Sequence, residues 1–147
     1  MRVEGYYCDI CTHNLYFCWE PDNELLANWA NWNKKPFIVT EFYTKAEDSG
    51  FKNAAGAGWV CPTQKERGQF LINYVLKLLE STNCVGFHWF RYMDCAKSGF
   101  EGANASDFDS NKGIVQTNLT EYTELTSAMY EVCKQAYSLI NFFNKRR

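Results

Sequence analysis

The sequence of this 147-residue chain predicts an α/β fold built on a small parallel sheet. Three short apolar runs, which end near residues 14, 41 and 90, alternate with three segments whose apolar residues recur at helical spacing. Segments 43–62 and 91–122 are long and irregular, whereas the connections at 33–35 and 81–83 are short. Because ligands gather at the carboxyl ends of parallel strands, this asymmetry indicates one functional edge of a barrel or open sheet.

The first βα unit begins with a predicted strand from Tyr6 to Asn14, followed by an aromatic loop and a helix that ends near Asn33. Pro21 suits the first turn of that helix, and Asp22 and Glu24 place negative charge at its N-terminus. The helix is indicated by apolar residues at helical spacing, namely Leu25, Leu26, Trp29 and Trp32.

The second strand is predicted from Pro36 to Glu41 and ends in a carboxylate. A carboxylate closes an apolar strand when it is paired, caps a turn or takes part in chemistry. The alternative to a chemical role is that Glu41 caps the next turn or pairs with a lysine.

The remaining elements follow from one motif and two apolar patterns. The segment from Thr63 to Glu66 is a capping box that opens a helix ending near Ser81. Residues 84–90 predict the third strand, and a last helix is predicted from about Thr123 to Phe143. Its apolar set is Leu125, Met129, Val132, Cys133, Ala136, Tyr137, Ile140 and Phe143.

Composition narrows the class of partner. The chain is 46% hydrophobic and 17% aromatic with a net charge of −2, and its basic residues are scattered apart from those at 145–147. We therefore expect neither nucleic acid nor a membrane as a partner. No apolar run is long enough to span a bilayer, and residues 1–4 do not open a signal peptide, so the sequence leaves the compartment open.

The seven cysteines are an odd number without a framework pattern. Cys8 and Cys11 form a C-x-x-C pair, but residues three apart on a predicted strand point to opposite faces. We expect free, buried thiols rather than a disulfide or a zinc site. The sequence indicates no metal and no cofactor.

Aromatic residues in the edge loops indicate a platform for a sugar ring. The flat faces of Trp and Tyr stack on the C–H faces of pyranose rings, and polar neighbours could bond hydroxyl groups. The alternative is that these aromatic side chains only pack the loops. The aromatic set is Tyr16, Trp19, Tyr43, Trp59, Trp89 and Tyr92, with Asn14, Asp94, Asn111 and Lys112 as polar neighbours.

Several segments resemble one enzyme family. Residues 35–42 resemble the seventh strand of (β/α)8-barrel retaining glycoside hydrolases that use two catalytic glutamates, in which this strand ends in the nucleophile. Residues 86–94 resemble the eighth strand, which ends in a substrate-stacking tryptophan, and residues 9–16 resemble the sixth. Residues 109–115, 122–125 and 129–132 are similar to the closing segment of β-agarase catalytic domains.

This resemblance implies a partial (β/α)8 TIM barrel, about the last three βα units, with residues 1–147 as the C-terminal portion of a catalytic domain. It implies that Glu41 is the nucleophile and that the substrate is an agarose-like galactan. If alternation is strict, Phe37, Val39 and Glu41 share one face, so Phe37 and Val39 would fill the barrel interior. The substrate-binding residues would be Asn14, Tyr16, Trp19, Tyr43, Trp59, His88, Trp89, Asp94, Asn111 and Lys112.

The chain departs from the family at the acid/base, which is a glutamate that follows an asparagine at the end of the fourth strand. The Asn-Glu pair here, Asn23-Glu24, falls in the first predicted helix, so the role does not transfer to it. We therefore interpret the chain as a C-terminal fragment, inactive alone, that would associate with the missing N-terminal barrel half or with itself. The resemblance implies that full-length relatives are secreted or periplasmic.

Two further interpretations stay open. The first is a non-catalytic carbohydrate-binding remnant of such a barrel, and the second is an unrelated α/β module with a structural Glu41. His13, His88 and Arg91 are candidates to hold or polarise Glu41, with a structural role as the alternative for each.

Overall fold

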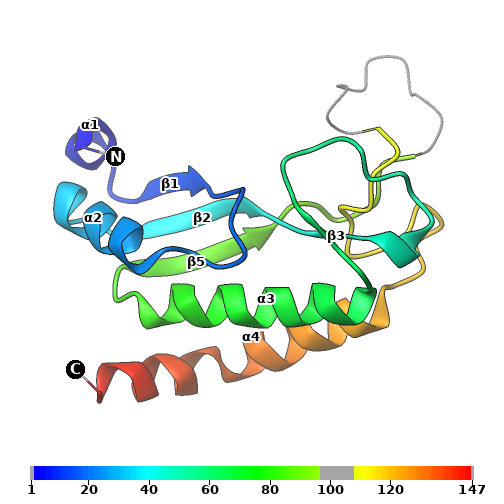
Figure 1. Cartoon of the computed structure of the whole chain (residues 1–147). Coiled ribbons are helices and arrows are strands. Elements are labelled where there is room, and N and C mark those ends of the chain that lie inside the picture. The colour runs from blue at the N-terminus through cyan, green and yellow to red at the C-terminus, as the bar shows by residue number, and fades with distance from the viewer. Residues whose placement is uncertain (1, 97–107, 147) are drawn as a thin grey trace.

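The computed structural model describes residues 2–96 and 108–146, and its centre is a three-stranded parallel sheet in the order β1-β2-β5 (Figure 1). The strands are β1 (Cys11–Asn14), β2 (Phe37–Phe42) and β5 (Cys84–Trp89). Helix α2 (Asn23–Asn33) joins β1 to β2, α3 (Gln64–Glu80) lies between β2 and β5 in the sequence, and α4 (Thr123–Asn144) follows β5. The predicted α/β fold with three parallel strands is confirmed.

The first predicted strand is wrong in its N-terminal half. Residues Arg2–Tyr7 form helix α1, in which the amide of Cys8 donates to the carbonyl of Glu4 at 2.8 Å. The Glu4 carboxylate also accepts from the amide of Thr12 at 2.6 Å. Tyr6 and Tyr7 are 80% and 79% exposed, so the two rings that indicated a buried strand lie at the surface.

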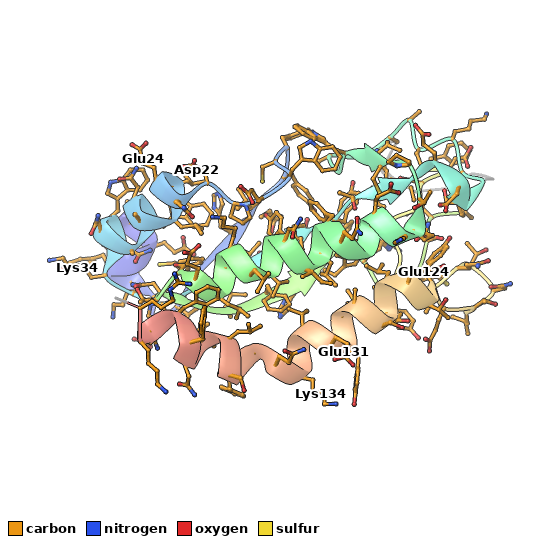
Figure 2. The ribbon with its side chains drawn as sticks, turned by 60° about the horizontal axis from the view of Figure 1, so that its bottom comes forward. Asp22, Glu24, Lys34, Glu124, Glu131 and Lys134 are labelled. Carbon is orange, nitrogen blue, oxygen red and sulfur yellow. The ribbon has the colours of Figure 1, made fainter. Side chains whose placement is uncertain are left out.

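Helix α2 begins two residues after its proline, at Asn23. Asp22 is the N-cap and accepts from the amide of Leu25 at 2.8 Å, so Pro21 precedes the helix instead of lying in its first turn. Asp22 and Glu24 lie at one end of α2 and Lys34, which has a left-handed backbone, at the other (Figure 2). This charge distribution complements the helix dipole.

Helices α3 and α4 form two successive layers on one side of the sheet (Figure 1). The capping box is confirmed, since Thr63 accepts from the amide of Glu66 and donates its hydroxyl to the Glu66 carboxylate. Nine residues of α3 are buried but only Leu125 and Val132 of α4. Tyr137, predicted in the apolar set of α4, is 85% exposed, because α4 contacts α3 with a narrow stripe.

The close approach of α3 and α4 depends on Gly68. An added Cβ there would lie 2.8 Å from the carbonyl oxygen of Glu124 and 3.2 Å from the Cβ of Ala128. We expect Gly68→Ala to lower the free energy of unfolding by about 1 kcal/mol, because overpacking of about 1–3 kcal/mol exceeds the gain in helix propensity. Urea denaturation measures this, with exposed Gln69→Ala as the control. A more stable Gly68→Ala variant would show that α4 moves aside freely.

A bulge in β2 decides which side chains face the helices. Between Val39 and Phe42 the strand carries one residue more than β5 opposite it, and the same shift appears against β1 at Asn14. Phe37, Val39 and Phe42 are at most 1% exposed and belong to the core that α2 and α3 complete. The prediction that Phe37 and Val39 fill a barrel interior on the side of Glu41 is therefore wrong.

Segment 43–62 contains a short sheet that the sequence did not indicate. Strands β3 (Lys45–Ala46) and β4 (Val60–Cys61) pair in parallel, and the 3-10 helix η1 (Glu47–Ser49) lies between them. All seven cysteines carry thiols and not disulfide sulfurs, as predicted, although Cys8 and Cys133 are exposed instead of buried. In the part of the chain that the structure describes, no helix has the length and apolar character needed to cross a bilayer.

Candidate active site

The carboxyl ends of the three strands meet at one edge of the sheet. Asn14 of β1 lies opposite Glu41 of β2, and Phe42 of β2 lies opposite Trp89 of β5. The prediction that Glu41 and Trp89 end neighbouring strands at the same edge is confirmed. Segments 43–62 and 91–122 both leave from this edge (Figure 1).

The half-buried Glu41 carboxylate is held by one short hydrogen bond. The hydroxyl of Tyr16, in the loop after β1, donates to Oε2 of Glu41 at 2.5 Å. Beside it the Thr40 hydroxyl donates to Oδ1 of Asn14 at 2.7 Å and ties β1 to β2. A hydroxyl that donates to a carboxylate fixes its orientation and leaves the other oxygen to act on a ligand.

The rings of Tyr16, Tyr43 and Phe90 pack in a row, which we call the aromatic wall. The ring centroids of Tyr16 and Tyr43 are 5.4 Å apart, and those of Tyr43 and Phe90 are 5.9 Å apart. The Lys112 ammonium lies 5.3 Å from the Tyr43 ring and 5.8 Å from the Phe90 ring. Sequence reasoning missed Phe90, although strand alternation in β5 places it on the face opposite its neighbour Trp89.

Trp89 lies on the helix-covered side of the sheet. Its ring packs against Phe42 at 5.6 Å and Phe70 of α3 at 6.2 Å, and its indole N–H donates to the carbonyl of Lys112 at 2.8 Å. The prediction that Trp89 and Glu41 face a shared cleft is therefore wrong. Trp89 lies on the same side of β5 as Phe87, two residues earlier, and both rings pack on Phe42, which the bulge in β2 turns toward α3.

Three predicted hydroxyl-binding residues are buried in the protein instead. Asp94, Asn111 and Lys112 are 2%, 0% and 1% exposed. One oxygen of Asp94 accepts from the Asn111 side chain at 2.9 Å and the Gly113 amide at 2.7 Å, while the other accepts from the Tyr122 hydroxyl at 2.5 Å. These groups hold segment 91–122 together and are not exposed to a substrate.

The same polar network joins segment 43–62 to segment 91–122, the two edge segments that leave the carboxyl ends of the strands. Oδ1 of Asn111 accepts from the Ala46 amide at 3.2 Å, and the amide of Asn111 donates to Oδ1 of Asn53 at 2.8 Å. Lys45 is 3% exposed, and its ammonium donates to the carbonyls of Asn53 and Ala55, each at 2.9 Å. Burial, and then the charge of Lys112, lower the pKa of Lys45.

Arg67 of α3 is the centre of this network and was missed from the sequence. It is fully buried, and its guanidinium donates to the carbonyls of Thr44 and Gly113 at 2.8 Å and to the Gln64 side chain at 2.9 Å. Burial lowers its pKa to about 10, although nearby Asp94 opposes the shift, so the guanidinium stays charged at neutral pH. The sequence does contain a signal that could have identified Arg67: it is a positively charged residue at a position where the helical spacing of α3 predicts an apolar one.

The remaining candidates are dispersed. His13 packs on Trp29 of α2 with ring centroids 4.5 Å apart, and its partial burial lowers its pKa. His88 is exposed on β5, and Arg91 donates to the sulfur of Cys95 at 3.6 Å. Trp19 and Trp59 pack edge to face with their ring centroids 4.8 Å apart.

Within residues 2–96 and 108–146, no three His, Cys, Asp or Glu side chains form a group that could hold a metal ion.

Comparison by sequence finds two β-agarases from Vibrio sp. (strain JT0107). Beta-agarase B is 29% identical over 140 residues, which are 90% of this chain and 13% of that protein. Beta-agarase A is 30% identical over 133 residues, 84% of this chain and 12% of that protein. No family model matches the chain.

Comparison with solved structures also finds agarases. The chain superposes on BpGH50 with a TM-score of 0.84 and 39% identity, over 97% of this chain and 29% of that one. It also matches an exo-beta-agarase (TM-score 0.80, 27% identity, 95% of this chain and 18% of that one) and the agarase AgWH50C (0.81, 27%, 95% and 20%). The chain thus spans less than a third of the length of each of these relatives. By sequence and by fold, it is related to one part of the β-agarases, which are glycoside hydrolases.

Proposed function

We propose that this chain supplies strands six to eight, the C-terminal portion, of a (β/α)8 catalytic domain in a retaining, β-agarase-like glycoside hydrolase. The observation that carries the proposal is the Glu41 carboxylate, which lies at the active edge of the central strand and is held by the Tyr16 hydroxyl. The parallel strands, the helices layered on one side and the relationship to β-agarases support it.

In this proposal Glu41 is the nucleophile. Its carboxylate attacks the anomeric carbon of the galactan, the bond to the leaving oxygen breaks, and a covalent glycosyl-enzyme forms. A second carboxyl group, about 5–5.5 Å away and contributed from outside this chain, protonates the leaving oxygen. The same group then takes a proton from water, which attacks the anomeric carbon and releases Glu41.

The residues around Glu41 would position the sugar. Tyr16 fixes the carboxylate, and the half-buried Phe90 ring offers apolar surface, while Tyr43, which is 4% exposed, packs between the two rings as a support. Asn14, opposite Glu41 in the register, and exposed His88 would bond hydroxyl groups of the substrate. Asp94, Asn111, Lys112 and Arg67 would act indirectly by fixing the two segments that carry this wall.

The test compares the chain alone with a chimera in which it replaces the matching segment of the agarase AgWH50C. We expect negligible release of reducing sugar from agarose by residues 1–147, because general-acid assistance is worth about 10²–10⁴-fold and the rest of the substrate site is absent. The chimera should hydrolyse agarose. A folded but inactive chimera would contradict the proposed function, and equal rates for chain and chimera would contradict the need for a second carboxyl group.

A further inference from the structure

We propose that the chain carries a second sugar-binding site on its outer, helix-covered side, and that this site binds a neutral galactan chain. It is a cleft of about 290 Å³ between the loop after β1 and the first half of α3, lined chiefly by Trp19, Pro62, Glu66, Gln69, Phe70 and Asn73. The class of sugar rests on the proposed function. The site itself is distinct from the Glu41 edge, because Phe70 belongs to the face of the sheet that α3 covers.

The exposed indole of Trp19 gives the cleft an apolar platform, and the indole of Trp59 packs beside it outside the lining. Trp19 and Trp59 remain 47% and 39% exposed although their rings meet edge to face at 79°. Trp19 also packs at 6.2 Å against Phe70, which is 6% exposed and anchored in the core. The indole therefore stands on a rigid base, and large flat rings left at the surface in this way are suited to stacking on the C–H face of a pyranose.

Polar groups of α3 complete the cleft. Gln69 and Asn73 are four residues apart, so they share one face of the helix, and both are exposed. Each amide offers two donors and an acceptor, which matches the mixed requirement of vicinal hydroxyl groups. Glu66 stands one turn before them, and the Thr63 hydroxyl fixes its carboxylate.

The charge of the lining selects a neutral sugar. Glu66 is the ionisable carboxylate of the cleft, and its other lining side chains are aromatic, apolar, amide or thiol groups. A sulfated or carboxylated sugar would place like charge beside Glu66, which disfavours binding. The volume is close to the lower end of small-molecule sites, about 300 Å³, and suits one or two sugar rings of a longer chain.

Every element of this cleft comes from this chain. Trp19 follows β1, Pro62 follows β4, and the rest belong to α3. The cleft therefore does not depend on the remaining strands of a barrel, and binding can be measured on residues 1–147 themselves.

The experiment is isothermal titration of the chain with a soluble agarose oligosaccharide. We expect Trp19→Ala, and separately the double variant Gln69→Ala/Asn73→Ala, to weaken the affinity about tenfold. Trp32→Ala, which removes an indole that is 43% exposed on α2, is the matched control and should bind like the parent chain, as should Glu41→Gln. Glu66→Gln keeps the capping box and should raise the affinity for a sulfated galactan. Circular dichroism confirms that each variant is folded.

The outcomes separate the two proposals. Unchanged affinity in both the Trp19 and the Gln69/Asn73 variants, or no binding by the parent chain, overturns the outer site without touching the hydrolysis experiment. Loss of binding in Glu41→Gln alone would place the sugar at the sheet edge and also overturn it. Binding that depends on Trp19 together with a folded, inactive chimera would support the outer site and overturn the proposed catalytic function.

Discussion

Glu41→Gln in the chimeric agarase should reduce kcat for agarose by at least about 10³-fold, because an amide cannot form the glycosyl-enzyme. The change is nearly isosteric, and the Tyr16 hydroxyl can donate to the amide oxygen as it does to Oε2 of Glu41, so the fold should be retained. A reducing-sugar assay under saturating agarose measures the rate, and thermal unfolding checks the fold.

Glu24→Gln is the matched control for that variant. Glu24 is exposed in the first turn of α2 and belongs to the chain's Asn-Glu pair, so its neutralisation tests whether that pair has the acid/base role. Glu24 lies at the N-terminal end of α2 (Figure 2), and we expect the rate of this variant to equal that of the parent chimera. Equal rates for Glu41→Gln and the parent would remove Glu41 from the mechanism, and with it most of the proposed function.

Arg67→Met should lower the free energy of unfolding by about 3–5 kcal/mol, a large fraction of the 5–15 kcal/mol typical of a domain. Methionine fills part of the volume but leaves the acceptors on Thr44, Gln64 and Gly113 buried without their donor. The free energy of unfolding of Arg67→Lys should lie between those of the parent chain and Arg67→Met, because an ammonium keeps the charge but not the planar fork.

Urea denaturation followed by circular dichroism measures these differences, with Lys65→Met as the control. Lys65 lies two residues earlier on α3 and is exposed, so its replacement should change stability by no more than about 0.5 kcal/mol. If Arg67→Met unfolded at the same urea concentration with the same slope, the network would not hold the two edge segments as described.

Local chemistry was sufficient for the frame of this fold. The capping box at Thr63 fixes the start of α3 because its hydrogen bonds close within four residues. The apolar run that ends in Glu41 is short and follows a proline, so both the strand and the carboxylate at its end could be predicted. The three parallel strands followed from the alternation of such local patterns.

The sequence alone therefore determined the three βα units, the edge at which they end and the carboxylate at the centre of that edge. The tertiary structure decided which way the side chains point there. A one-residue bulge in β2 turns Phe42 toward α3, where Trp89 packs on it, and leaves Glu41 beside the Tyr16 hydroxyl. Strand alternation is a local rule, but a bulge forms only where the neighbouring strands and helices pack against it, so no pattern within the run from 36 to 42 could have revealed it.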